Sequence, residues 1–307
     1  MSFFSPQPPP PDAPSGAPAP RELAAAMALR LGARAHERPP RQGPFLLVLE
    51  AGLRQQDAPE LAALKQLLLL QGLSSIALEC QGPQDLQACA QFAAGLAASQ
   101  EGFVIGIGGA ALTLQLARAA WTRGCPLGLL ARGPGRQLAH LHGLPQDLPL
   151  AVQAWQRRLA TPAAVGLLNG EPFFAEARLA PAASEAGQPS AFGLPWRHHD
   201  PASPAHPPTT LRLRLDQDAA PELVRALQAG TQLPGAGPAG PTPARALHAL
   251  IRLADGSSQL RPFHSAIALA QDAEAGLRLE IDGQPAAEAG HAALRLADTP
   301  LLLMRGC

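Results

Sequence analysis

Two glycine-rich turns lie close together in the sequence, Gly106-Ile-Gly-Gly-Ala-Ala-Leu112 and Arg132-Gly-Pro-Gly-Arg136, the second directly after the apolar segment Pro126–Ala131. Each turn has a strand-like apolar segment before it and a helical pattern after it. Backbone N–H groups at such turns, with the positive end of the following helix, form a site for phosphate. Phosphoryl transfer from a nucleotide also needs a metal ion held by carboxylates, yet residues 102–146 contain no Asp or Glu. The stretch therefore predicts a phosphate-binding cradle that lacks the carboxylate needed to hold a metal ion.

Short apolar segments alternate with helical segments between residues 45 and 131. This alternation predicts βαβ units around a buried parallel sheet. Ligands of such sheets bind beyond the carboxyl ends of the strands, where both glycine turns lie. The expected strands are Phe45–Leu49, Ser75–Glu79, Phe103–Ile107 and Leu127–Ala131, and the expected helices are Pro59–Gln71, Pro83–Ala98 and Ala110–Trp121.

The second half of the chain has a different pattern, in which apolar and polar residues alternate along short segments. Such alternation predicts an antiparallel, sandwich-like sheet with one polar face. The expected strands are Leu211–Leu215, Leu247–Leu253, Leu277–Ile281 and Ala293–Leu296, and one helix is expected at Ala220–Ala229.

Two domains and an N-terminal segment follow from these patterns. Residues 1–43 form a proline-rich N-terminus and linker, in which residues 1–20 are expected to be disordered and Arg21–Leu31 a short helix. Residues 44–168 form an α/β domain. Residues 169–307 form a β-rich domain with flexible insertions at 181–208 and 230–243, which are rich in proline and small residues.

The order of residues across the two turns resembles the diacylglycerol kinase-like lipid kinases, including bacterial diacylglycerol, sphingosine-type and YegS-like enzymes. Their first signature, Gly-Gly-Asp-Gly-Thr-Leu-Asn-Glu, is matched here by Gly108-Gly109-Ala110-Ala111-Leu112-Thr113-Leu114-Gln115. Their second signature aligns without a gap with Pro126–Pro145. Five positions of that second match fall in register: Gly133, Gly135, Ala139, Gly143 and Pro145.

The resemblance extends over most of the chain. Beyond the second signature the family has an amphipathic helix, a strand, an Asn-Gly turn, an aromatic strand, an acidic turn near the C-terminus and a closing apolar strand. The corresponding segments here are Leu148–Leu159, Ala164–Leu168, Asn169-Gly170, Phe173-Phe174, Ile281–Gln284 and Leu301–Met304. The resemblance thus implies a nucleotide-binding α/β domain and a β-rich domain with the active cleft between them.

The resemblance also implies ATP and Mg²⁺ as cofactors and a lipid hydroxyl as the acceptor. Asp282 matches the acidic turn and is the candidate catalytic residue. The acids of the signatures are replaced at four positions, by Ala110, Gln115, Gln137 and Gln284. The residues implied to hold nucleotide phosphates are Gly108, Gly109, Ala110, Gly133 and Gly135, with Arg132 and Arg136 beside them.

Two functional hypotheses remain. The favoured one is a pseudokinase that keeps the fold and binds nucleotide, lipid or a partner without transferring phosphate. The other is an active lipid kinase that takes its metal-binding carboxylate from elsewhere. The pseudokinase is favoured because losing metal ligands normally costs orders of magnitude in rate. The candidate replacement acids are Asp147, Glu171, Glu176 and Asp282.

Several patterns have a second interpretation. Gly106–Ala111 also fits the G-x-G-x-x-A dinucleotide fingerprint, but no acid for the ribose follows, so only NADP with Arg132 on its phosphate would fit. The same glycines could instead serve only for tight packing of the helix. Arg132 and Arg136 are equally well explained as a solvated loop. Asp282-Gly283 is typical of a plain hairpin turn. A proline-rich, solvated loop explains His198, His199, Asp200 and His206 better than a metal site does.

Composition excludes several classes of protein. The formal net charge is +0 and the pI about 7.1, which does not favour a nucleic-acid partner. Lys65 is the only lysine, so a P-loop lysine is absent. The four cysteines form no CxxC pair, and we expect neither a signal peptide nor a membrane-spanning segment of roughly 20 apolar residues. We expect a cytoplasmic protein with reduced cysteines. The resemblance also allows peripheral contact with the inner face of the membrane. The sequence leaves the oligomeric state open.

Overall fold

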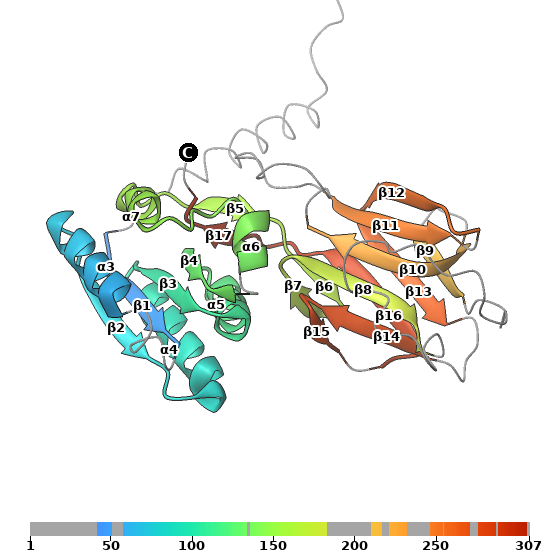
Figure 1. The fold of residues 1–307 in the computed structure, drawn as a ribbon. Coiled ribbons are helices and arrows are strands. Elements are labelled where there is room, and N and C mark those ends of the chain that lie inside the picture. Colours follow the sequence, from blue (N-terminus) through green and yellow to red (C-terminus); the bar gives the residue numbers. More distant parts are fainter. Residues whose placement is uncertain are drawn as a thin grey trace, which may run out of the picture. The chain divides into compact units, whose positions relative to one another are not determined.

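A six-stranded sheet forms the centre of the first part of the chain, in the order β2-β1-β3-β4-β17-β5 (Figure 1). All its pairs are parallel except β17 with β5. Strands β1, β3 and β4 are buried along their whole length, as expected for a parallel sheet covered on both faces. The strands are β1 (Phe45–Leu49), β2 (Ser75–Glu79), β3 (Phe103–Gly108), β4 (Leu127–Ala131), β5 (Thr161–Ala163) and β17 (Leu301–Leu303).

This computed structural model describes residues 42–50, 58–133, 136–182, 210–216, 221–231, 246–253, 255–270, 276–286 and 288–305. The chain divides into two units, Met1–Arg41 and Gln42–Cys307, and all described residues belong to the second. The expectations for residues 1–20 and Arg21–Leu31, and for most of the insertions 181–208 and 230–243, lie outside the described residues, as do His198, His199, Asp200 and His206.

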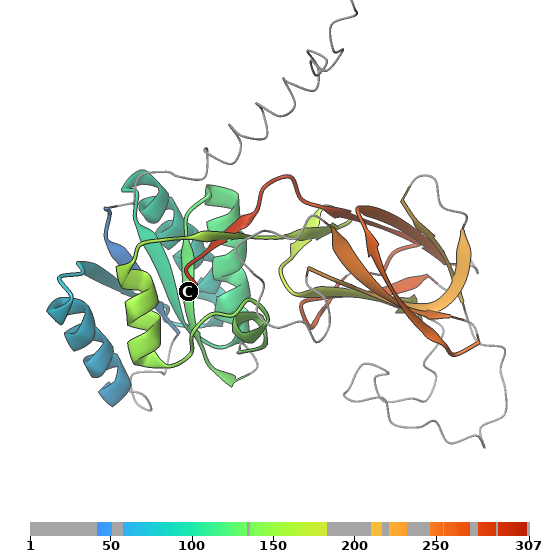
Figure 2. The ribbon, with the colours of Figure 1, turned by 90° about the horizontal axis from the view of Figure 1, so that it is seen from above.

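Helices cover both faces of the parallel sheet. On one face, α3 (Ala58–Leu70) and α7 (Leu148–Gln156) pack on the side chains of Phe45 and Phe103. On the other face, α4 (Leu86–Ser99), which follows the short 3₁₀ helix η1 (Pro83–Asp85), and α5 (Ala110–Arg123) pack on alternate residues of the same strands. In Figure 2 the strands lie between the two groups of helices. The predicted α/β arrangement is confirmed.

The second sheet is antiparallel throughout its described residues, in the order β15-β14-β8-β10-β9-β13-β16-β6-β7, with β11 and β12 joined to it through β10. One face packs on a single apolar core and the other is largely polar, so the burial alternates along β8, β9 and β16. The strands are β6 (Gly166–Leu168), β7 (Glu171–Phe173), β8 (Glu176–Pro181), β9 (Leu211–Leu215), β10 (Glu222–Gly230), β11 (Leu247–Leu253), β12 (Ser258–Phe263), β13 (Ser265–Ala270), β14 (Leu277–Ile281), β15 (Gln284–Pro285) and β16 (His291–Leu296). The predicted antiparallel β-rich part is confirmed.

One element differs from the sequence prediction. Most of the segment expected to be a helix at Ala220–Ala229 belongs to strand β10, which pairs with β8, β9 and β11. A β-bulge between Val224 and Ala226 adds one residue to the strand, so the buried residues Val224 and Leu227 stand three apart instead of two. That spacing is typical of a helix face, which explains the wrong prediction.

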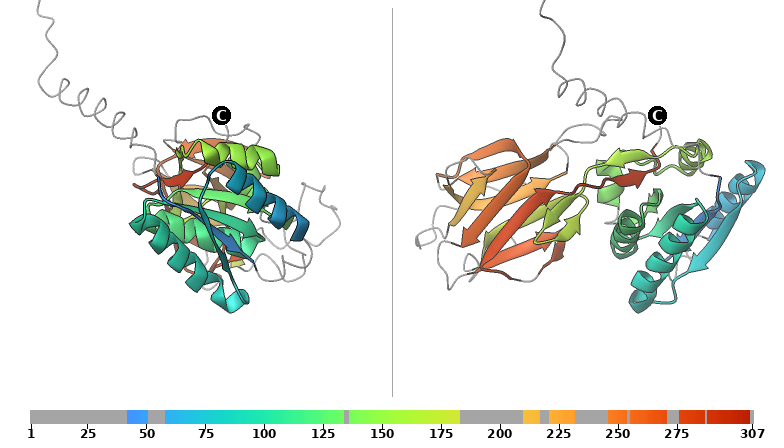
Figure 3. Two further views of the ribbon diagram at one scale, coloured as in Figure 1. Left: turned by 90° about the vertical axis from the view of Figure 1, so that its left-hand side faces the viewer. Right: turned by 180° about the vertical axis from the view of Figure 1, so that it is seen from behind.

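Two strands belong to a different sheet from their neighbours in the sequence. Strand β6 precedes residue 169 and pairs with β16 in the antiparallel sheet. Strand β17 returns to the parallel sheet, where it pairs with β4 and β5 (Figure 3, right). The domain bounds 1–43, 44–168 and 169–307 stay a prediction. In the part of the chain that the structure describes, no helix is long and apolar enough to cross a membrane.

Candidate phosphate-binding site

The two glycine turns lie side by side at the carboxyl edge of the parallel sheet, as predicted. Gly108, the last residue of β3, is paired with Ala131, the last residue of β4. The next residue, Arg132, donates its backbone N–H to the carbonyl of Gly108 over 2.7 Å. Gly109 then stands at the N-terminus of α5. Gly133 has a left-handed backbone with φ of 51°, whereas Gly135 lies outside the described residues.

Two of the glycines allow close packing within the chain. A Cβ at Gly106 would lie 2.5 Å from Cδ1 of Leu116, so this glycine lets α5 approach β3. A Cβ at Gly108 would lie 2.7 Å from Oε2 of Glu50. Gly108 therefore makes room for a carboxylate of this same chain.

Glu50 brings to the cradle the acid that residues 102–146 lack. It follows β1 directly, and its backbone N–H continues the ladder by donating to the carbonyl of Ile107 over 3.1 Å. Its side chain turns to the start of α5, where Oε2 accepts the N–H of Gly109 over 2.5 Å. The N-terminus of α5 is thus already bound to an anion of the chain itself.

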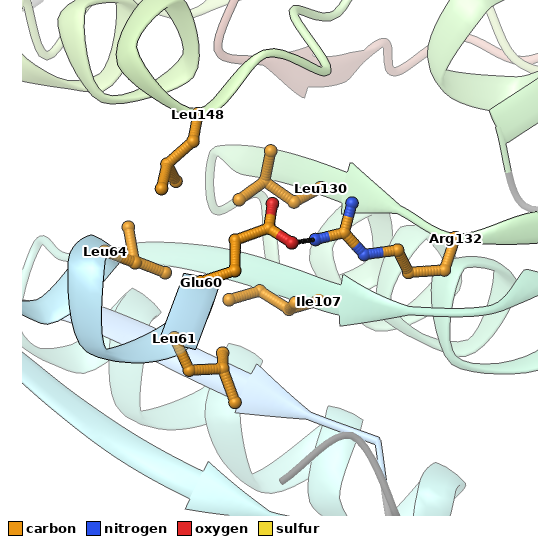
Figure 4. Close-up of a pocket in the computed structure, with 7 residues that line it drawn as sticks. All are labelled: Glu60, Leu61, Leu64, Ile107, Leu130, Arg132 and Leu148. Carbon is orange, nitrogen blue, oxygen red and sulfur yellow. Dashed lines mark ion pairs between the residues drawn. The ribbon is translucent and has the colours of Figure 1, made fainter. Parts of the chain in front are cut away.

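Arg132, the first residue of the second glycine turn, is also paired with a carboxylate of the chain. Arg132 forms an ion pair with Glu60 from the first turn of α3 (Figure 4). The pair covers a cavity of only about 10 Å³, room for about one water molecule. The apolar walls of the cavity are Leu61, Leu64, Ile107, Leu130 and Leu148. The space next to Arg132 is thus filled by protein side chains.

Two further residues predicted to bind phosphate, Ala110 and Arg136, lie at the N-termini of helices. Ala110 begins α5 and is half-buried, and Arg136 begins the short helix α6 (Arg136–Leu141) and is exposed. The edge of β4 is completed by a side chain: Gln146 Oε1 accepts the N–H of Ala131 over 2.8 Å, and its Nε2 donates to the carbonyl of Leu129 over 3.1 Å. The polar edge beside the cradle is therefore satisfied from within the chain.

All four predicted replacement acids have partners within the chain, and those of Asp282 are described in the next paragraph. Asp147 caps α7 by accepting the N–H of Leu150 over 3.2 Å. Glu171 is exposed and lies 4.0 Å from Arg118. Glu176 pairs with Arg178 and accepts a hydrogen bond from the side chain of Gln228. Glu50 and Glu60, which the sequence analysis did not consider, are the acids that meet the two glycine turns.

Asp282 forms the hairpin turn that its Asp-Gly sequence predicts. It joins β14 to β15, with positive φ at both Asp282 and Gly283. Its carboxylate accepts the backbone N–H groups of Phe174, Ala175 and Glu176 over 2.9, 2.7 and 2.9 Å. Burial raises the pKa of Asp282 above its usual value, and the three hydrogen bonds oppose that rise. These contacts give the carboxylate a structural role, while its catalytic role stays a prediction.

The backbone carbonyl of Phe174 contacts two buried polar side chains, His142 and Thr231. Its carbonyl lies 2.7 Å from Nε2 of His142 and accepts the hydroxyl of Thr231 over 2.9 Å. Both side chains are almost fully buried. Burial lowers the pKa of His142 to about 4, so the imidazole is neutral at neutral pH, and with Nε2 protonated it donates to Phe174. Sequence alone offered no signal for this buried histidine.

Comparison with solved structures settles the fold. No protein-family model and no curated protein sequence matches the chain. Among solved structures, a protein of Bacillus anthracis strain Sterne described as a diacylglycerol kinase superposes with a TM-score of 0.65 at 12% identity, covering 86% of this chain and 97% of that one. The chain has the diacylglycerol kinase fold.

Two further structures support the same conclusion. A second structure described as a diacylglycerol kinase of the same strain gives a TM-score of 0.65 at 11% identity, and a third gives 0.57 at 12%. They cover 86% of this chain and 98% and 97% of their own. The resemblance seen in the two signatures of the diacylglycerol kinase fold thus reflects a shared architecture.

Proposed function

We propose that the chain is a pseudokinase of the diacylglycerol kinase fold, which binds nucleotide weakly and does not transfer phosphate to a lipid. The observation that supports this proposal is the hydrogen bond from Gly109 N–H to the carboxylate of Glu50. In the cradle implied by the resemblance, this N–H group would meet a nucleotide phosphate. Here an incoming phosphate must displace a carboxylate and meets its negative charge.

The other positions of the cradle support the same proposal. Ala110 supplies no carboxylate at the start of α5, and the guanidinium of Arg132 is engaged by Glu60. In the described part of the chain, no group of three or more His, Cys, Asp or Glu side chains is arranged to hold a metal ion. If Mg²⁺ binds together with ATP, Glu50, which contacts Gly109, would be a protein ligand for it.

The alternative function, an active ATP-dependent lipid kinase, rests on this same residue. Glu50 contacts Gly109 and joins Asp147, Glu171, Glu176 and Asp282 as a candidate for the replacement acid. The two functions differ in what the removal of the Glu50 charge should do. A blocking carboxylate lowers phosphate affinity, whereas a metal-holding carboxylate raises it. An NADP site is less favoured, because Arg132, its required phosphate ligand, is paired with Glu60.

We expect Glu50→Gln to raise the affinity for ATP by roughly tenfold, because one like charge near the phosphates is removed while the side chain keeps its size. Isothermal titration of the full chain with ATP, with and without Mg²⁺, measures this change, and NADP serves as a second titrant. Glu101→Gln, at an exposed turn, is the matched control and should leave the affinity unchanged. A loss of Mg²⁺-dependent ATP binding in Glu50→Gln would refute the blocking role and favour the active kinase.

A further inference from the structure

Strands β9, β13 and β16 present an exposed face that is basic at its margins and apolar at its centre. Pairing places Arg214 and Ala293 on either side of Ile267. One step along, Arg212 and His291 flank Leu269 in the same way. Ile267 is 40% and Leu269 45% exposed. We call this surface the basic face; its residues are Arg212, Arg214, Ile267, Leu269, His291, Ala293 and Arg295.

The charge of the basic face is of one sign. Its seven residues include three arginines and no acid. Within the described residues no carboxylate lies within ion-pairing distance of Arg212 or Arg214, and Arg295 has only a contact of 3.9 Å to the fully exposed Asp298 at the rim. The second rim acid, Asp216, already accepts two backbone N–H groups. Because the whole chain has a formal net charge of +0, the positive charge is a local feature.

A shallow hollow lies within this face. Its volume is about 600 Å³, and it is lined by Arg214 and Arg295, by Ser265 and by the Asn169-Gly170 turn. Asn169 holds that turn against β16, because its Oδ1 accepts the N–H of Ala293 over 2.7 Å. Two guanidinium groups and a hydroxyl around one hollow suit a phosphate group, since arginine binds phosphate oxygens in pairs.

The pairing of the strands decides what kind of partner fits. Each of β9, β13 and β16 is hydrogen-bonded to a neighbouring strand on both sides. A peptide therefore cannot add as an extra strand at this surface. Exposed aliphatic side chains surrounded by arginines instead match the boundary between phosphate headgroups and acyl chains of a bilayer.

We propose that the basic face docks the protein on an anionic phospholipid surface, with a headgroup phosphate in the hollow between Arg214 and Arg295. Ile267 and Leu269 contact the acyl boundary beneath the headgroups. This docking requires no phosphate transfer and does not depend on Glu50, so it goes beyond the pseudokinase proposal.

Sedimentation of the full chain with vesicles tests the proposal. We expect binding to vesicles of phosphatidylcholine mixed with phosphatidylglycerol, little binding to phosphatidylcholine alone, and release at high salt. The double variant Arg214→Gln/Arg295→Gln should weaken binding roughly 25-fold, about fivefold for each arginine near an anionic surface. The control Arg123→Gln/Arg157→Gln removes the same charge from exposed positions at the ends of α5 and α7 and should bind like wild type. Thermal unfolding of each variant verifies that it is folded.

A second variant and a soluble ligand separate the alternatives. Ile267→Ser/Leu269→Ser should also weaken vesicle binding, with the salt dependence unchanged. The proposal would be overturned if wild type did not bind anionic vesicles. It would also be overturned if Arg214→Gln/Arg295→Gln and Arg123→Gln/Arg157→Gln lost vesicle affinity to the same extent. Glycerol 3-phosphate binding as tightly as vesicles would show a site for a free phosphate instead. A dimer that Ile267→Ser/Leu269→Ser dissociates, at unchanged vesicle affinity, would show that a second copy covers the face.

Discussion

Replacing Asp282 with alanine should destabilise the protein by about 3–5 kcal/mol, because three backbone N–H groups lose their acceptor in a buried place. The carboxylate ties the β14–β15 turn to the connection between β7 and β8 and to the first residue of β8. Its loss therefore loosens two segments of the antiparallel sheet at once. Urea unfolding followed by circular dichroism measures the change in the free energy of unfolding.

Asp255→Ala is the matched control for this experiment. Asp255 also accepts a backbone N–H in a turn between two strands, that of Ser257 over 2.8 Å, but it is exposed. Water can replace its carboxylate, so we expect little change in stability. Asp282→Asn keeps one acceptor oxygen and should fall between wild type and Asp282→Ala. Equal urea midpoints for wild type and Asp282→Ala would show that Asp282 is free for another role, such as catalysis.

The second large effect is a dependence of stability on pH that originates at His142. The pKa of its imidazole is about 4 in the folded protein and about 6.5 in the unfolded chain. Between these two values the unfolded chain binds a proton that the folded protein does not bind. This part of the stability is fully present above about pH 6.5 and is lost as the pH falls to about 4. The loss amounts to about 3 kcal/mol.

His142→Gln isolates this contribution, because glutamine can donate a hydrogen bond to the carbonyl of Phe174 but does not titrate. Urea unfolding at a series of pH values should show a steeper decline for wild type than for His142→Gln between pH 6.5 and 4. The exposed His140, two residues away, provides the control His140→Gln, which should follow wild type. Parallel curves for wild type and His142→Gln would contradict the buried, neutral state of the imidazole.

The fold was largely readable from local patterns, and the exception has a local cause. Short apolar strands alternating with helices identified β1, β3 and β4, since buried parallel strands are apolar on both faces. Strand β10 was misassigned because its bulge changes the spacing of Val224 and Leu227. A bulge depends on pairing with neighbouring strands, which the pattern of one segment does not reveal.

The site was readable only in part. The glycine turns stand out in the sequence, but the acids that meet them lie far away along the chain: Glu50 is 59 residues before Gly109, and Glu60 is on α3. Glu50 directly follows an expected strand, so the rule that parallel strands end at one edge could have found it. The contact of Glu60 with Arg132 depends on where α3 lies over that edge, which the sequence pattern does not reveal. For His142, burial is a property of the folded packing and has no sequence pattern.

The most direct test of the pseudokinase proposal is transfer of labelled phosphate from ATP to diacylglycerol in mixed micelles with Mg²⁺. Wild type and Glu50→Gln should both show no product above the background without protein, even though Glu50→Gln binds ATP more tightly. Product formed by wild type and lost in Glu50→Gln would contradict the proposal, because it would make Glu50 a carboxylate that supports phosphoryl transfer.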